Sequence, residues 1–151
     1  AVGKTSVGLE IARLSGGSFS DADDLHGEAN VATMAAGIPL TDDDRWPWLD
    51  RVGFALTPGT VMACSALRRV YRDVLRRHAS TVVFVHLHAD PDRLLAQAQA
   101  RTDHFMPPSL LQSQLALLEP LGADEPGVVV TVDAAPADLA ARAVEAVRAR
   151  S

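Results

Sequence analysis

Short apolar segments alternate with helical segments along most of the chain. Apolar runs at 60–64, 81–87 and 128–132 have the length and unbroken hydrophobicity of strands that are buried on both faces. Segments with helical spacing of apolar residues lie between and around them, for example at 5–15 and 67–78. This alternation predicts an α/β fold with a parallel sheet covered by helices on both sides. Ligands of such sheets bind at the carboxyl ends of the strands.

Further elements follow from capping and turn signals. A short strand around Phe19 leads into a run of aspartates, and a helical piece is expected at about 27–36. Thr41 followed by three aspartates has the pattern of an N-cap with an acidic first turn, which predicts a helix to about residue 56. Asp90-Pro91 should start another helix, and Ser109 should cap one at 110–118.

Size, charge and cysteine content limit the class of protein. With 151 residues and 48% hydrophobic residues, the chain fits one domain spanning 1–151. A net charge of -5 argues against broad contact with nucleic acid or an anionic membrane. Cys64 is the single cysteine, which excludes an internal disulfide framework and a cysteine-based zinc cage. No apolar run approaches the roughly 20 residues of a membrane span, and no signal peptide is evident. We therefore expect a soluble, cytoplasmic protein.

The first residues contain a phosphate-binding signal. Gly3-Lys4-Thr5 at the start of a helix matches the end of the G-x-x-x-x-G-K-[ST] loop, in which backbone N–H groups and the helix N-terminus hold phosphate oxygens. The candidate nucleotide-binding residues are Gly3, Lys4, Thr5 and Ser6. The first glycine of the motif would lie three positions before Ala1, so we expect the chain to be a fragment that lacks the first strand and the front of the loop.

Carboxylates occur where the next strand should end. Asp21-Ala22-Asp23-Asp24 follows the strand around Phe19, and alternation places Asp21 and Asp23 on the same side. In a phosphate-loop kinase, this strand should deliver carboxylates to the metal and to the hydroxyl that accepts the phosphoryl group. The position relative to Lys4 favours this function over a solvated turn.

From residue 21 onward, several ordered blocks resemble the gluconokinases over nearly the whole chain. The blocks that carry the resemblance are Asp21 to His26, Glu28-Ala29-Asn30, Met34 to Leu49, Cys64 to Arg69, Tyr71-Arg72-Asp73, His104 to Pro107, Ser113-Gln114 and Leu118-Glu119-Pro120. The resemblance implies a three-layer α/β/α phosphate-loop fold like that of the shikimate and adenylate kinases. It also implies transfer of the γ-phosphoryl group of ATP to the terminal hydroxyl of D-gluconate, which yields 6-phosphogluconate.

The resemblance assigns roles to individual residues. Lys4 would bind the nucleotide phosphates, and Thr5 with Asp21 would lie beside Mg²⁺. Asp23 would face the gluconate hydroxyl and accept its proton, although the two aspartates could exchange roles. Arg101 would neutralise charge on the transferred group from a lid at about 101–108. Within and before that lid, Gln97, Thr102 and Asp103 stand where the family pattern is more basic.

Gluconate carries a carboxylate and several hydroxyls, so its pocket needs a fixed cation and hydrogen-bonding groups. Arginine can contact a carboxylate through two parallel hydrogen bonds. Arg45 is the first candidate because it lies in the most specific block, with Arg69 and Arg72 second. His26 and Gln114 could contact hydroxyls, although His26 could equally serve in capping or packing. The resemblance also suggests a homodimer.

Two other functions remain open from the sequence. One is a kinase for another small hydroxy acid such as shikimate, which would need a different arrangement of arginines. The other is a catalytically silent module that binds a nucleotide or a sugar acid, which the incomplete phosphate loop and the altered lid would favour.

Overall fold

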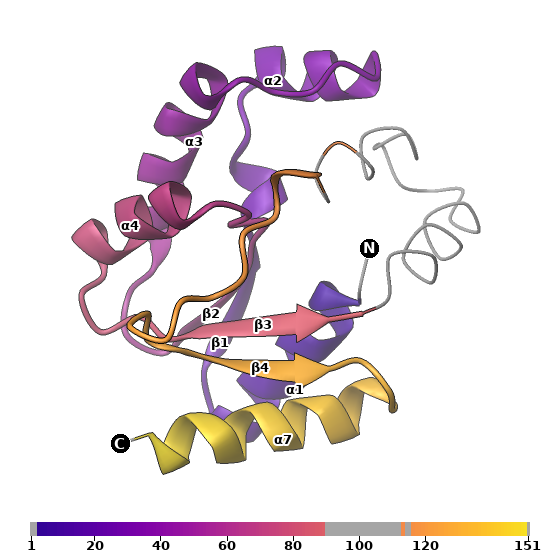
Figure 1. Ribbon diagram of the computed structural model, residues 1–151, viewed down its shortest axis with the longest axis vertical. Helices are drawn as coiled ribbons and strands as arrows, with labels where there is room; N and C mark the ends of the chain where they lie inside the picture. Colours follow the sequence, from indigo (N-terminus) through magenta and orange to yellow (C-terminus); the bar gives the residue numbers. More distant parts are fainter. Residues whose placement is uncertain (1–2, 90–112, 114–115, 151) are drawn as a thin grey trace.

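The computed structural model describes residues 3–89, 113 and 116–150, and Figure 1 shows their arrangement. Helices and strands alternate largely as the sequence predicts. The described elements are α1 (Lys4–Ser15), β1 (Ser18–Asp21), η1 (Ala22–Leu25), α2 (Glu28–Ala35), α3 (Asp42–Ala55), β2 (Thr60–Ala63), α4 (Arg69–His78), β3 (Phe84–His88), β4 (Gly127–Thr131) and α7 (Pro136–Ala149). The helices expected from Asp90 and at 110–118 fall mostly outside the described residues.

The strands pair in parallel, as the apolar runs predict. β1 pairs with β2, with Asp21 opposite Ala63, and β3 pairs with β4, with His88 opposite Thr131. Among the described strands these pairs form two separate two-stranded sheets, whereas the sequence predicted one sheet. The carboxyl ends of β1 and β2 therefore lie side by side, which brings Asp21 next to the residues that follow Ala63.

Helices cover the strands on two sides (Figure 1). α1 and α7 pack together against one side, where Val7 and Leu139 are buried with Val130 of β4. α3 and α4 pack together on the other side. β3 contributes side chains to the hydrophobic cores on both sides. Val85 packs toward α1 and α7, whereas its neighbour Phe84 packs toward α3 and α4. This alternation is expected of a strand buried on both faces.

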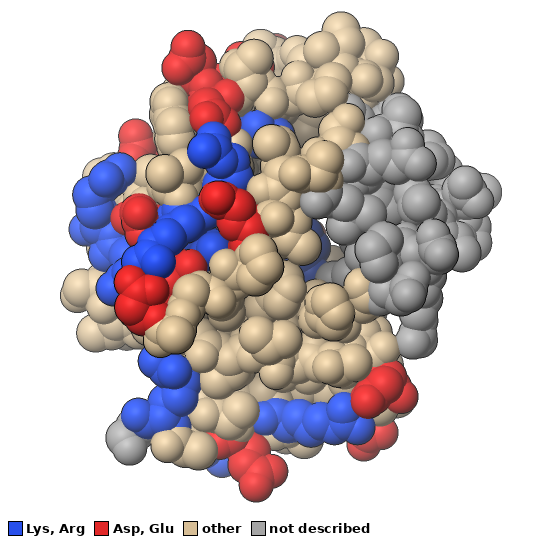
Figure 2. Space-filling model, viewed as in Figure 1, with Lys and Arg blue, Asp and Glu red and all other residues tan. Residues whose placement is uncertain are grey.

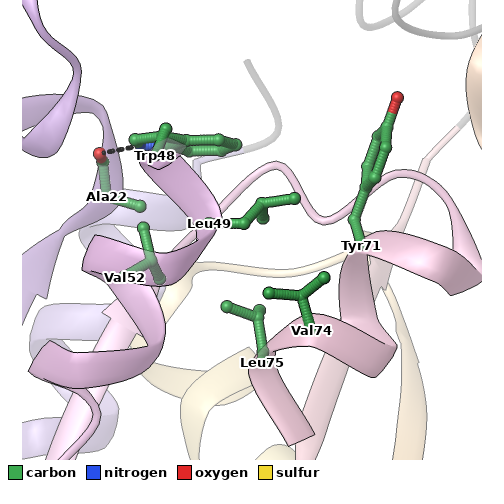
Figure 3. Packing of buried hydrophobic residues seen from close by; sticks show 7 residues of the cluster. All are labelled: Ala22, Trp48, Leu49, Val52, Tyr71, Val74 and Leu75. Atoms are coloured by element: carbon green, nitrogen blue, oxygen red, sulfur yellow. Dashed lines mark hydrogen bonds between the residues drawn. The ribbon is translucent and has the colours of Figure 1, made fainter. Parts of the chain in front are cut away.

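The second core fixes the helices that carry the candidate substrate residues. Figure 3 shows Trp48, Leu49 and Val52 of α3 facing Tyr71, Val74 and Leu75 of α4. Burying a large apolar side chain of this kind contributes about 1.5–3 kcal/mol. The Trp48 indole Nε1 donates to the Ala22 carbonyl over 2.7 Å, which ties α3 to the turn after β1. The aspartate run and the start of α3 are thus held in fixed relative positions.

The ends of α1 and α3 follow from local sequence. Gly3 precedes α1 with φ 80°, and Gly16 ends it with φ 71°; both angles lie in the left-handed region that favours glycine. Thr41 caps α3 as predicted, because its hydroxyl accepts from the Asp44 N–H while the Asp44 carboxylate accepts from the Thr41 N–H. No helix among the described residues is long and apolar enough to cross a bilayer.

Candidate active site

The predicted phosphate-binding residues lie beside the predicted acids. Lys4 begins α1 and its Nζ donates to Ser65 Oγ over 2.7 Å. One residue further along, Thr5 Oγ1 lies 3.5 Å from Asp21 Oδ2. Thr5 and Ser6 are exposed on the first turn of the helix. The arrangement therefore brings a cation, a hydroxyl and a carboxylate to one edge of the β1–β2 sheet.

Asp21 organises the turn that carries Asp23. Its Oδ1 accepts from the Asp23 N–H over 2.9 Å and so caps the short helix η1. Cys64, at the end of β2, experiences the charges of Lys4, Asp23 and Asp21. Burial raises the pKa of the Cys64 thiol to about 12, so the thiol stays neutral at neutral pH and serves in packing.

A small pocket that is partly open to solvent lies next to this edge. Polar groups line one part of it and apolar side chains line the rest. Its lining residues are His26, Met34, Pro39, Leu40, Arg45, Trp48, Ser65, Leu67 and Ser113. Ser65 belongs to the pocket and also contacts Lys4, so the pocket adjoins the phosphate-binding residues.

His26 enters the pocket as a neutral hydrogen-bonding group. Its ring stacks on Trp48 with a centroid distance of 4.2 Å and an interplanar angle of 13°. Burial, helped by Arg51 and Arg45, lowers the pKa of His26 from 6.5 to about 4. The Asn30 amide nitrogen lies 3.2 Å from Nδ1. Because that nitrogen can only donate, Nδ1 accepts and Nε2 carries the proton.

Arg45 is a buried cation that lines the pocket. It is 6% exposed, and its Nη1 donates to the Tyr71 hydroxyl over 3.1 Å. Tyr71 in turn donates to Asp42, whose carboxylate also accepts from Arg68 over 2.7 Å. This hydrogen bond from Tyr71, with Arg68 and Arg45, lowers the pKa of Asp42, and burial raises that of Tyr71. At neutral pH the tyrosine therefore keeps its proton and the aspartate keeps its charge.

The charge of Arg45 is only partly matched within the described residues. Asp42 Oδ1 lies 3.8 Å from Arg45 Nη1, a longer separation than the 2.7 Å between Asp42 and Arg68. Arg68 also has Glu119 at 3.8 Å. Taking a cation out of water is costly unless a partner anion is near. A carboxylate in the pocket would supply that partner to Arg45.

Arg69 and Arg72 were predicted to contact substrate, and the geometry gives them other partners. Arg69 contacts Asp124 through both terminal nitrogens at the surface. Arg72 is 3% exposed and all five of its N–H donors are used, by the Glu125 carboxylate and by three backbone carbonyls. Neither residue lines the pocket. Figure 2 shows that basic and acidic side chains, in blue and red, alternate on the side of the molecule formed by α4. The contacts of Arg72 with the described residues are therefore structural, and its predicted contact with the substrate stays a prediction.

Comparison with known proteins places this geometry in a family. No family model matches the chain. A gluconokinase of Gluconobacter oxydans is 44% identical over 135 residues, which cover 85% of this chain and 76% of the relative. A probable gluconokinase of Rattus norvegicus is 37% identical and covers 97% of this chain and 92% of the relative. The chain belongs to the gluconokinase family.

A solved structure agrees with this gluconokinase family membership. The crystal structure of a gluconokinase from Sinorhizobium meliloti is 43% identical, with a TM-score of 0.89, and covers 99% of this chain and 87% of that one. The predicted α/β phosphate-loop kinase fold is therefore confirmed, as is the prediction that the chain is a kinase. The kinase class also implies the use of ATP.

Sequence reasoning missed two residues of the candidate site and predicted two that lie outside the described residues. Ser65 and Tyr71 lie in the blocks Cys64 to Arg69 and Tyr71-Arg72-Asp73, but their contacts depend on partners far away in sequence. The one sequence signal for Ser65 and Tyr71 was that they belong to these two blocks. Arg101, Gln114 and the lid at 101–108 lie outside the described residues.

The low pKa of His26 predicts an acid-sensitive fold. In the folded protein the pKa of His26 is about 4, below its ordinary value of 6.5. The unfolded chain therefore binds this proton more readily, so the contribution of His26 to stability is complete above pH 6.5 and is lost as the pH falls toward 4. We expect His26→Gln to weaken the decline of unfolding free energy between pH 6.5 and 4, measured by urea titration. An identical decline in both proteins would contradict this.

Proposed function

We propose that the protein phosphorylates the terminal hydroxyl of D-gluconate with ATP. The observation that carries the proposal is the link from Lys4 through Ser65 to a pocket that contains Arg45. One cation lies at the helix start suited to nucleotide phosphates, and the other is a buried, partly matched guanidinium suited to a carboxylate. A sugar acid lying between them would present its carboxylate to Arg45 and its far hydroxyl to the phosphate-binding edge. The gluconokinase relatives support this choice of substrate.

The acids after β1 are suited to the acceptor hydroxyl. The oxygen of that hydroxyl attacks the γ-phosphorus, the bond from this phosphorus to the β,γ-bridging oxygen breaks, and ADP leaves with the electron pair. The proton of the hydroxyl passes to the Asp23 carboxylate. Lys4 offsets the negative charge on the phosphate oxygens, so positioning and charge neutralisation supply most of the rate enhancement.

Asp21 is the aspartate that we propose to lie beside a metal. Its two oxygens already contact the Thr5 hydroxyl and the Asp23 N–H. A hydroxyl and a carboxylate are hard oxygen donors, which fit Mg²⁺. The described residues contain no cluster of three or more His, Cys, Asp or Glu side chains that could hold a metal by themselves. This fits an ion that arrives with the nucleotide, and Mg²⁺ would withdraw charge from its phosphate oxygens.

Two residues outside the described part of the chain complete the proposed site. Arg101 would stabilise charge on the transferred group and Gln114 would contact a gluconate hydroxyl. The homodimer and the cytoplasmic location also stay predictions. His26, with its proton on Nε2, is a donor available to a hydroxyl of the substrate.

A substrate panel tests the proposed function. ADP release, measured with a coupled assay at fixed ATP, should be fast with D-gluconate and weak with D-glucitol, which has the same carbon chain but a primary alcohol in place of the carboxylate. It should also be weak with shikimate. Equal rates with gluconate and glucitol would contradict the proposed contact between Arg45 and the substrate carboxylate. A higher rate with shikimate than with gluconate would identify shikimate as the substrate instead. Binding of ATP and gluconate without ADP release would instead identify a silent module.

Tyr71→Phe tests how Arg45 is held. The hydroxyl of Tyr71 connects Arg45 Nη1 to Asp42, so its removal frees the guanidinium to move and leaves the ring packing in place. A net hydrogen bond contributes about 0.5–1.5 kcal/mol, which corresponds to a rise of about 2- to 13-fold in the KM for gluconate. The KM for ATP should not change. Val74→Ala, which alters the same core without touching the hydrogen bonds, serves as the control. An unchanged gluconate KM in Tyr71→Phe would show that Tyr71 does not position Arg45.

A further inference from the structure

Ser65 lies where the two substrate regions meet. It follows the end of β2, and its hydroxyl accepts from Lys4 Nζ over 2.7 Å although the two residues are 61 positions apart. The same residue lines the pocket that contains Arg45 and His26. A change in the hydrogen bonding of this hydroxyl would therefore affect both the phosphate-binding residues and the pocket.

The backbone around Ser65 is fixed, whereas its lysine partner is adaptable. Arg72 donates to the carbonyls of Ala66 and Leu67, the next two residues, over 3.0 and 3.3 Å. The buried Glu125 holds the Arg72 guanidinium in place through two further hydrogen bonds. Lys4, by contrast, carries its charge on a flexible four-carbon stem. When the contact between Lys4 and Ser65 changes, the ammonium should be the group that moves.

A nucleotide would compete with Ser65 for Lys4. The phosphate oxygens are anionic, whereas the serine hydroxyl is neutral, so the ammonium is attracted more strongly to phosphate. Once Lys4 turns to phosphate, a lone pair of Ser65 Oγ is free to accept a hydrogen bond. In an occupied pocket, the hydroxyls of the sugar acid would be donors available to this lone pair.

We propose that Ser65 is a positioning residue that couples the two substrates: nucleotide binding releases its hydroxyl from Lys4, and the released hydroxyl then accepts a hydrogen bond from the sugar acid. The proposal rests on the proposed function. The effect of one net hydrogen bond is a gain of about 2- to 13-fold in the affinity for gluconate. Because coupling is reciprocal, gluconate should raise the affinity for the nucleotide by the same factor.

Calorimetric binding without turnover tests this coupling. Gluconate is titrated into the protein with and without a saturating non-hydrolysable ATP analogue and Mg²⁺. In the unchanged protein the Kd for gluconate should fall about 2- to 13-fold when the analogue is present. In Ser65→Ala the two Kd values should be equal, and Ser65→Thr, which keeps a hydroxyl, should retain the difference. A general loss of structure is monitored by the thermal unfolding of each variant.

Lys4→Ala provides a second, opposite readout. Without the ammonium the Ser65 hydroxyl is never engaged, so gluconate should bind without nucleotide as tightly as it binds the unchanged protein with the analogue. A difference between the two Kd values in Ser65→Ala as large as in the unchanged protein would overturn the coupling role and leave the proposed function standing. Failure of the unchanged protein to bind gluconate under either condition would overturn both.

Discussion

Replacing Lys4 with alanine should lower the rate constant of gluconate-dependent ADP release by about 100-fold or more while the fold remains intact. Removal of one preorganised donor from a developing negative charge typically costs about 10²–10³ in kcat. In the described part of the chain, the ammonium of Lys4 contacts the Ser65 hydroxyl, and Lys4 stands at the start of α1, so its loss should disturb the structure little. Steady-state kinetics and thermal unfolding measure the two effects separately.

Arg13→Ala is the matched control for Lys4→Ala. The Arg13→Ala substitution also removes a positive charge, but from the other end of α1, where Arg13 pairs with Glu10 at the surface. Its loss should leave kcat within about twofold, because surface pairs of this kind contribute little. If Lys4→Ala kept most of its turnover, or if both variants lost the same activity, the start of α1 would not be the phosphate-binding region.

Removing Arg72 should produce the largest loss of stability among the substitutions considered. Truncating one partner of a buried ion pair leaves an unmatched charge and typically costs about 3–5 kcal/mol. The Glu125 side chain is fully buried, and Arg72 also satisfies the carbonyls of Ala66, Leu67 and Pro120. Urea unfolding of Arg72→Ala should therefore show a reduction of this size in the unfolding free energy.

Two further variants separate charge from packing in this prediction. Arg142→Ala breaks an ion pair with Asp133 that is exposed on both sides, so it should cost about 1 kcal/mol or less. The double variant Arg72→Met with Glu125→Leu removes both charges and keeps most of the volume, so it should recover much of the lost stability. If Arg72→Ala were no more damaging than Arg142→Ala, the pair would not be a structural element.

Local signals in the sequence were sufficient for the fold and for half of the site. Continuous apolar runs predicted parallel strands, and Thr41 with Asp44 predicted the start of α3, because both signals depend on neighbours in sequence. The contact between Thr5 and Asp21 follows from the same logic, since a helix start and a strand end that meet at one sheet edge must be close. Arg45 was selected from its block of resemblance, and it does line the pocket.

The remaining features depend on long-range pairing that a sequence pattern does not reveal. The arginines of α4 look alike in sequence, but Arg69 and Arg72 face Asp124 and Glu125, more than 50 residues away. Their acids are therefore part of the scaffold, whereas Arg45 faces a neutral tyrosine and a more distant carboxylate. The role of Ser65 was hidden for the same reason, because its partner Lys4 lies 61 positions away in sequence.

Nuclear magnetic resonance of the reaction product tests the central claim most directly. The protein is incubated with ATP, Mg²⁺ and D-gluconate labelled with ¹³C at every carbon, and the phosphorus–carbon couplings locate the new ester. With Arg45 holding the carboxylate and Asp23 at the far hydroxyl, the phosphate should appear on C6, and Asp23→Asn should slow its formation strongly. An ester at any other carbon, or release of inorganic phosphate without a sugar phosphate, would contradict the account.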